Sequence, residues 1–128
     1  MSKPVYLAVD GDDVGRSLEY LILTNQDKTL RVFSHSVADA VEWLSDELVQ
    51  VLGAELVFKG GDNILCTLTP NERFAEKSDA LRRSFHKRTG CTISIGLGTS
   101  ASEAYIALKF AKASGKDRVC TYDEVWHG

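Results

Sequence analysis

Five short apolar segments in this 128-residue chain have the pattern of β-strands. Most of them are rich in β-branched or aromatic residues, and each is bounded by glycine, proline or charged residues. The first ends at a run of carboxylates, Asp10-Gly11-Asp12-Asp13, which predicts a turn directly after a strand. The predicted strands occupy 4–9, 54–58, 64–69, 91–98 and 118–123.

The stretches between these strands carry apolar residues at helical spacing. A short helix is predicted over 17–23, and a longer one carries apolar residues three or four positions apart from Leu30 to Val51. Gly53 and Gly90 are suited to end helices, since glycine accepts the left-handed conformation that often follows a helix. The third helix is predicted over 71–89; the fourth carries Ala104, Leu108 and Ala111, begins at a cap formed by Ser100 or Ser102, and ends at Gly115.

The resulting order is strand, helix, helix, strand, strand, helix, strand, helix, strand. Gly60, Gly61 and Asp62 separate the second and third strands, which predicts a hairpin because glycine tolerates the positive φ of tight turns. Two helices join the first strand to the second, and such a crossover permits parallel pairing. We therefore predict a single α+β domain over 1–128, ferredoxin-like or palm-type, with a mixed central sheet and helices on one face.

Composition and charge narrow the class of protein. Fifteen basic and 18 acidic residues give a net charge of -3, which argues against a stable nucleic-acid partner. No segment reaches the roughly 20 apolar residues of a membrane span, and the N-terminus lacks the pattern of a signal peptide, so a cytoplasmic protein is expected. Cys66, Cys91 and Cys120 are far apart in the sequence and are expected to be reduced and buried.

Acidic residues gather at two predicted turns. Asp10, Asp12 and Asp13 follow the first strand, and Asp62 lies in the hairpin. In a palm-type topology these two points are neighbours, and clustered carboxylates there would bind a hard divalent cation such as Mg²⁺ or Mn²⁺ together with substrate phosphates. The alternative is a pair of ordinary acidic turns, because Asp, Asn and Gly are common turn residues.

Glycines and lysines add to this pattern. Gly11, Gly60 and Gly61 lack a Cβ atom, so a nucleotide could approach the backbone closely. Lys112 and Lys116 are four positions apart at the end of the last helix, where both could hold a triphosphate. Their alternative role is a solvated helix end, where cations favour the C-terminal dipole.

Four motifs in this order carry a resemblance to a known superfamily. The segments VYLAVDGDDVG, FKGGDNILC, TISIGLGTS and ALKFAKASGKDRV resemble those of palm-type nucleotidyl cyclases, which include GGDEF diguanylate cyclases and the palm of the large subunit of type III CRISPR complexes. The small size and the DGDDVG segment are most similar to the minimal CRISPR polymerase (mCpol) group, stand-alone palms associated with antiphage defence. The resemblance spans nearly the whole chain.

This resemblance implies a site and a reaction. Asp10 and Asp62 would be the catalytic, metal-binding carboxylates, with the carbonyl of Gly11 as a further ligand. The substrate is expected to be an NTP, most of all ATP, joined into a cyclic di- or oligonucleotide with release of pyrophosphate. A homodimer and a separate effector that senses the product are the implied partners. The residues implied to bind nucleotide or phosphate are Asp12, Asp13, Val14, Gly15, Gly60, Gly61, Asn63, Lys112 and Lys116.

The chain also departs from its relatives. Asn63 stands where many of them have a second acid, which weakens a second metal site unless Asp12 or Asp13 supplies a ligand. The RxxD inhibition motif of many diguanylate cyclases is absent from 54–59, which disfavours cyclic di-GMP as the product. Two alternatives stay open: a purine-ring hydrolase resembling GTP cyclohydrolase III, which shares the GGDN form, and a nucleotide-binding palm without activity.

Overall fold

The computed structural model describes residues 3–127. The predicted order of elements is confirmed, with one short helix added after the last strand. The elements are β1 (Val5–Gly11), α1 (Val14–Leu23), α2 (Asp27–Gln50), β2 (Glu55–Lys59), β3 (Asn63–Leu68), α3 (Phe74–Thr89), β4 (Ile93–Gly98), α4 (Ala101–Ala113), β5 (Val119–Thr121) and α5 (Tyr122–His127).

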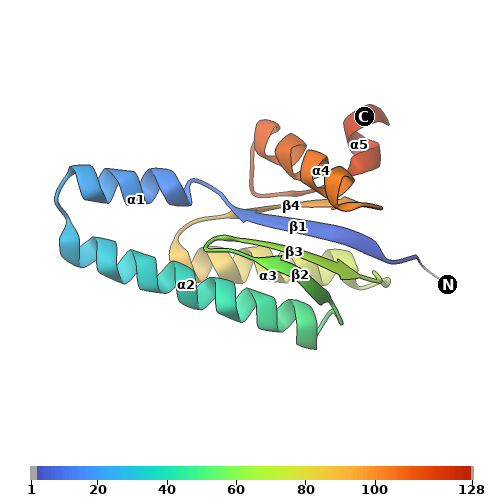
Figure 1. Cartoon of the computed structure of the whole chain (residues 1–128), viewed down its shortest axis with the longest axis horizontal. Helices are drawn as coiled ribbons and strands as arrows, with labels where there is room; N and C mark the ends of the chain where they lie inside the picture. Colours follow the sequence, from blue (N-terminus) through green and yellow to red (C-terminus); the bar gives the residue numbers. More distant parts are fainter. Residues whose placement is uncertain (1–2, 128) are drawn as a thin grey trace.

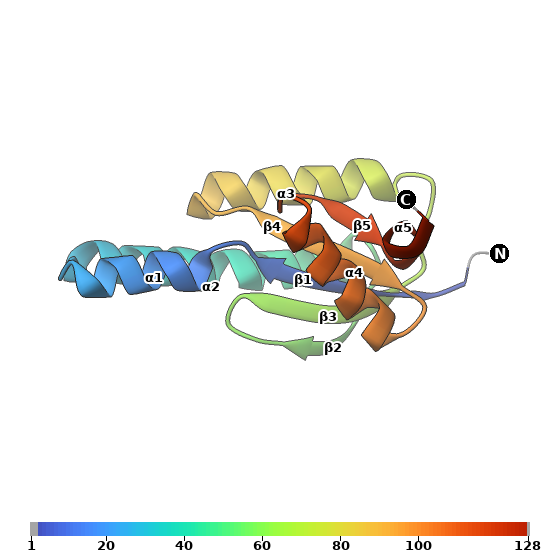
Figure 2. The same ribbon diagram turned by 90° about the horizontal axis from the view of Figure 1, so that it is seen from above.

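The five strands form one mixed sheet in the order β2-β3-β1-β4-β5, as Figure 2 shows from above. β1 pairs antiparallel with both β3 and β4, β2 pairs antiparallel with β3, and β4 and β5 are parallel. The first two strands run in the same direction but do not pair, because β3 lies between them. This order places the end of β1 beside the hairpin that joins β2 and β3.

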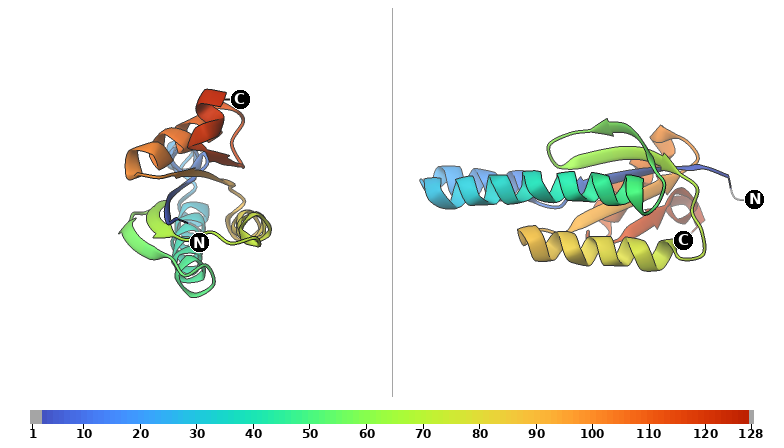
Figure 3. Two further views of the ribbon diagram at one scale, coloured as in Figure 1. Left: turned by 90° about the vertical axis from the view of Figure 1, so that its right-hand side faces the viewer. Right: turned by 90° about the horizontal axis from the view of Figure 1, so that it is seen from below.

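Helices cover both faces of the sheet, so the prediction of helices on one face was wrong. α2 and α3 lie on one side and α4 lies on the other (Figures 1 and 3). The side chains of β1 explain this arrangement: Leu7 and Val9 belong to the larger core, whereas Ala8 between them packs in a second cluster with Leu108 of α4. The apolar run of β1 is thus the pattern of a strand buried on both faces.

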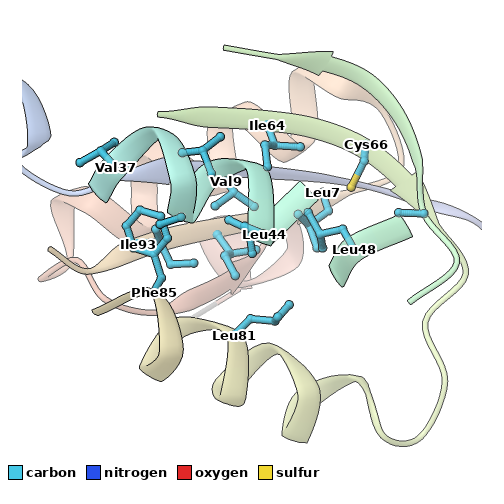
Figure 4. Close-up of a cluster of buried hydrophobic side chains, with 14 of the residues drawn as sticks. Leu7, Val9, Val37, Leu44, Leu48, Ile64, Cys66, Leu81, Phe85 and Ile93 are labelled. Carbon is cyan, nitrogen blue, oxygen red and sulfur yellow. The ribbon is translucent and has the colours of Figure 1, made fainter. Parts of the chain in front are cut away.

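The larger core lies between the sheet and the two helices α2 and α3 (Figure 4). Leu44 and Leu48 of α2 and Phe85 of α3 are almost completely buried there. Cys66 is buried among them, and burial raises the pKa of its thiol to about 12. The three cysteines are free and buried, as the sequence indicated.

Helix boundaries follow the predicted signals. Gly90 ends α3 in the left-handed conformation, with φ of 78°, and Gly53 has φ of 68° just beyond α2. Ser100, rather than Ser102, caps α4 by accepting a hydrogen bond from the Glu103 amide. α1 and the first half of α2 project past the end of the sheet (Figure 1). Within 3–127, no helix is long and apolar enough to cross a membrane.

Candidate active site

Two carboxylates meet where β1 ends and the hairpin turns. Asp10 pairs across the sheet with Asn63, and the amide of Gly11 donates to the carbonyl of Asp62 over 2.9 Å. Burial, and then the negative charge of Asp10, raise the pKa of the Asp62 carboxyl above its ordinary value. The predicted proximity of the two acidic turns is therefore confirmed, and the two carboxylates repel each other.

Close packing, rather than an unusual backbone angle, requires a glycine in this hairpin. A Cβ atom on Gly60 would lie 2.2 Å from the amide oxygen of Asn63, whereas one on Gly61 would point into open space. Neither glycine has a positive φ, so the prediction that the turn needs a positive φ at these two positions was wrong. The amide oxygen of Asn63 is itself buried without a hydrogen-bond partner.

Lys112 of α4 reaches the end of β1. Its Nζ lies 2.9 Å from Asp10 Oδ2 and 3.1 Å from Asp12 Oδ1, and it donates to the carbonyl of Gly11 over 3.0 Å. Burial alone would lower the pKa of Lys112, but its bonds to the Asp10 and Asp12 carboxylates outweigh burial and raise it. The ammonium therefore stays charged, and it contacts two of the three groups assigned to a metal.

Asp12 has a structural role, which differs from the predicted contact with nucleotide. Its side chain is buried and accepts hydrogen bonds from Thr92 Oγ1 at 2.7 Å, Ser94 Oγ at 2.8 Å and the amide of Asp117 at 3.0 Å. Burial would raise the pKa of Asp12, but these bonds and the one from Lys112 lower it. Both carboxylate oxygens are thus occupied within the chain, and the Asp12 amide donates to the Thr92 carbonyl at 2.8 Å, so neither the side chain nor the amide is available to a nucleotide or a second metal.

The remaining predicted phosphate contacts surround the start of α1. Asp13 adopts the left-handed conformation, with φ of 62°, and precedes the helix without a side-chain cap. The buried Val14 and exposed Gly15 begin the helix, whose first N–H groups favour an anion. Lys116 Nζ lies 2.6 Å from Asp13 Oδ1, and this hydrogen bond lowers the pKa of Asp13.

Helix α3, which the sequence did not connect with the site, holds the loop that carries Lys116. Lys116 and Asp117 are both left-handed, with φ of 65° and 49°. Arg82 of α3 donates to the Asp117 carbonyl at 2.9 Å and to its carboxylate at 2.8 Å. The contacts of Arg82 could not be predicted from the pattern of α3. Thr92 and Ser94 did carry a signal, since two polar residues two positions apart in a buried strand indicate a buried partner.

The donor set suits a hard divalent cation. Asp10, Asp62 and the Gly11 carbonyl offer oxygen atoms only, which Mg²⁺ prefers, and a carbonyl oxygen has two lone pairs, so Lys112 does not exhaust it. Among the residues that the structure describes, no group of three or more His, Cys, Asp or Glu side chains could hold a metal. A cation here would thus depend on the backbone carbonyl, water and substrate as well as the two carboxylates.

Comparisons with known proteins identify the fold and the family. The sequence pattern of the minimal CRISPR polymerase domain (mCpol) matches residues 6–122. No curated protein matches the chain in sequence. The active GGEEF domain of a diguanylate cyclase from Vibrio cholerae is similar in structure, with a TM-score of 0.61 and 17% identity over 94% of this chain and 83% of that chain.

Csm1 proteins share the same fold. Csm1 of T. onnurineus has a TM-score of 0.66 and 20% identity, and a Csm1–Csm4 cassette in complex with AMPPNP has a TM-score of 0.69 and 19% identity. Each match covers 91% of this chain but 20% of the Csm1 chain, so this protein corresponds to one part of Csm1. At identities this low, the structural similarity shows a common palm-type fold and no more than that. The mCpol pattern spans nearly the whole sequence, and the protein therefore belongs to the minimal CRISPR polymerase (mCpol) family.

Proposed function

We propose that this protein is a Mg²⁺- or Mn²⁺-dependent nucleotidyltransferase that joins and cyclises NTPs, with ATP as the expected substrate. The observation that carries this proposal is the placement of Asp10 and Asp62 at neighbouring points, the end of β1 and the β2–β3 hairpin. Lys112 is bonded there to Asp10 and to the Gly11 carbonyl. Membership of the mCpol family supports it. The product would be a cyclic di- or oligonucleotide.

The metal would be held by Asp10, Asp62 and the carbonyl of Gly11. When bound, it would polarise the α-phosphate and neutralise the charge that develops there. The raised pKa of Asp62 supports this assignment, because a cation would relieve the repulsion from Asp10. One metal per chain is proposed, because both carboxylate oxygens of Asp12 are bonded within the chain.

The triphosphate would lie along Lys112, Lys116 and the first turn of α1. The Asp13–Lys116 ion pair is partly exposed, and such pairs contribute little to stability, so a phosphate can replace Asp13 as the partner of Lys116. Val14 and Gly15 would contribute backbone N–H groups to the same phosphates. Lys112 is fixed by Asp12 beside the reacting phosphate.

The proposed reaction is an in-line displacement at phosphorus. A ribose hydroxyl oxygen forms a bond to the α-phosphorus as the bond from that phosphorus to the bridging oxygen breaks. Pyrophosphate leaves with the electron pair, and the hydroxyl proton passes to solvent. A second displacement of the same kind within the linear product closes the ring.

The proposal includes partners outside the chain. Each chain carries one such pair of carboxylates, so a homodimer would supply a site for each bond of a cyclic dinucleotide. Family membership also supports a role in CRISPR-related antiphage defence, in which a separate effector protein senses the product.

The test incubates the protein with each NTP and Mg²⁺ or Mn²⁺ and identifies the products by mass spectrometry. Asp62→Ala is expected to abolish pyrophosphate release. Asp46→Ala, which removes the same charge from an exposed position on α2, should leave it unchanged. Three results would overturn the proposal: release that persists in Asp62→Ala, ring-opened GTP as the product, or NTP binding without turnover under either metal.

A further inference from the structure

A cavity lies beside Asp10, on the face of the sheet that α4 covers only in part. Its volume is about 270 Å³. Asp10 and Asn63 line it near the end of β1, and Phe58 of β2 with Tyr105 and Lys109 of α4 line it further away. The cavity is therefore continuous with the proposed metal site through Asp10.

Two aromatic rings at this cavity are unusually exposed. Phe58 and Tyr105 each keep 55% of their surface accessible, although aromatic side chains gain most from burial. Lys109 Nζ lies 5.1 Å from the centre of the Tyr105 ring. Exposed aromatic rings close to a cation are a recurring means by which proteins bind single-stranded nucleic acid, because a base stacks on the ring and the cation attracts phosphate.

The position of the cavity along α4 indicates which of the two reacting nucleotides it could bind, the one that attacks or the one that loses pyrophosphate. Tyr105, Lys109 and Lys112 are spaced at i, i+4 and i+7, so they share one side of the helix. Lys112 contacts Asp10, and Tyr105 lies about 10 Å before it along the helix axis. The cavity thus extends from Asp10 away from the end of α4 that carries the proposed triphosphate contacts.

In-line attack requires the entering hydroxyl on the side of the α-phosphorus opposite to the leaving pyrophosphate. With the leaving group at Lys112 and Lys116, the entering ribose must lie on the cavity side of Asp10. A larger cavity, of about 510 Å³, lies between α1, α2 and the end of α3, and neither Asp10 nor Asp62 lines it.

We propose that the cavity beside Asp10 binds the base of the acceptor ribonucleotide, whose hydroxyl attacks, with Phe58 and Tyr105 as the stacking surfaces and Lys109 as a contact for its phosphates. This inference rests on the proposed nucleotidyltransferase function. It makes Phe58 and Tyr105 binding residues for the acceptor rather than for the nucleotide that loses pyrophosphate.

The first experiment measures binding without turnover. The Asp62→Ala variant, labelled with ¹³C in its methyl groups, is titrated with AMP and observed by NMR. We expect shifts of the methyl signals of Leu65 and Leu108, which also line the cavity, and about tenfold weaker binding when Tyr105→Ala is added. Shifts confined to other methyl groups, or an unchanged affinity with Tyr105→Ala, would overturn the inference.

The second experiment separates the acceptor from the other nucleotide. Phe58→Ala and Tyr105→Ala should each raise the ATP concentration for half-maximal joining about tenfold. In these variants the affinity for the first molecule of α,β-methylene-ATP to bind should change by less than about twofold. Tyr105→Trp, which keeps an aromatic ring at this position, should join nucleotides as the unaltered protein does. Val57→Ala, which alters an exposed neighbour outside the cavity, is the matched control. Weaker binding of the analogue, by as much as joining is impaired, would show that the cavity holds the other nucleotide and would overturn the inference.

These two experiments distinguish the failure of this inference from that of the proposed function. A protein that joins no nucleotides overturns the function, yet the AMP titration still decides whether the cavity binds a base. A protein that joins nucleotides equally well without either ring overturns the inference alone. Both rings are more than half exposed, so their loss should leave the thermal unfolding temperature nearly unchanged.

Discussion

Three acids that are neighbours in the sequence occupy three different environments. Asp10 is partly exposed beside Lys112, Asp12 is buried in a network of hydrogen bonds, and Asp13 forms an ion pair at the surface. The same residue type thus serves as a candidate ligand, a structural anchor and a surface partner. Environment, not sequence proximity, decides which of these carboxylates can reach a substrate.

The buried carboxylate of Asp12 should stabilise the fold in a pH-dependent way. Asp12→Asn is expected to lower the free energy of unfolding at pH 7 by about 2 kcal/mol, because a charged hydrogen-bonding partner is lost. The folded-state pKa of Asp12 is below its ordinary value of 3.8, so its contribution is complete above that value and is lost as pH falls through the folded pKa. Urea unfolding without metal at pH 7 and in acid measures both effects. A difference between variants that stays constant into strong acid would contradict this role.

The hairpin glycines should differ in their tolerance of alanine. A Cβ atom on Gly60 would meet the Asn63 amide oxygen, which is the end of a side chain, so Gly60→Ala must turn the Asn63 side chain away from its place beside Asp10. We expect its rate of nucleotide joining to fall by about tenfold, because Asn63 lines the cavity next to Asp10. Gly61→Ala adds a methyl group in open space and is the matched control. Equal rates for the two variants would show that the turn adjusts freely.

At the scale of elements, the position of α4 determines the site, since this helix carries Lys112 to the end of β1. β4 allows the close approach because Gly96 and Gly98 have no side chain beneath the helix. A Cβ atom on Gly96 would lie 2.2 Å from the carbonyl oxygen of Ala104 and from the amide nitrogen of Leu108, both backbone atoms that cannot rotate away. The helix would have to lift from the sheet.

Gly96→Ala should therefore destabilise the protein strongly. The expected loss is about 3 kcal/mol, typical of severe overpacking, with a fall in thermal unfolding temperature of roughly 10 °C. Differential scanning calorimetry measures both, and Gly61→Ala again provides a glycine-to-alanine change without a clash. An unfolding temperature equal to that of the unaltered protein would mean that α4 packs less tightly than this geometry indicates.

Local signals predicted the elements well, and long-range contacts account for most of what they missed. The strand before Asp10 and the hairpin at Asp62 have clear boundary residues, so their meeting followed from topology. The second helical layer was missed, although the apolar run of β1 fits a strand buried on both faces, because the helix patterns do not show on which side of the sheet each helix packs. The bonds of Asp12 to Ser94 and Asp117 join residues more than 80 positions apart in sequence, beyond the reach of any local pattern.

At the scale of the whole molecule, the described residues offer one pair of site carboxylates, whereas the proposed cyclic product would need at least two new bonds. Asp10 is at the end of β1 and Asp62 is in the adjoining hairpin, and α1 and α2 project beyond this end of the sheet (Figure 1). A second copy could present its own nucleotide there. Within such a dimer, each copy would form one of the two bonds of a cyclic dinucleotide.

This arrangement predicts how wild-type protein behaves when mixed with a large excess of Asp62→Ala. Most wild-type chains would then pair with an inactive partner, which leaves one working site for two bonds. The first bond still forms, but the second must await a new encounter, so linear dinucleotide should accumulate relative to the cyclic product. Mass spectrometry of the two products against the mixing ratio measures this. If the ratio of linear to cyclic product does not change with any excess, a single copy closes the ring, and the proposed division of the two bonds between subunits is wrong.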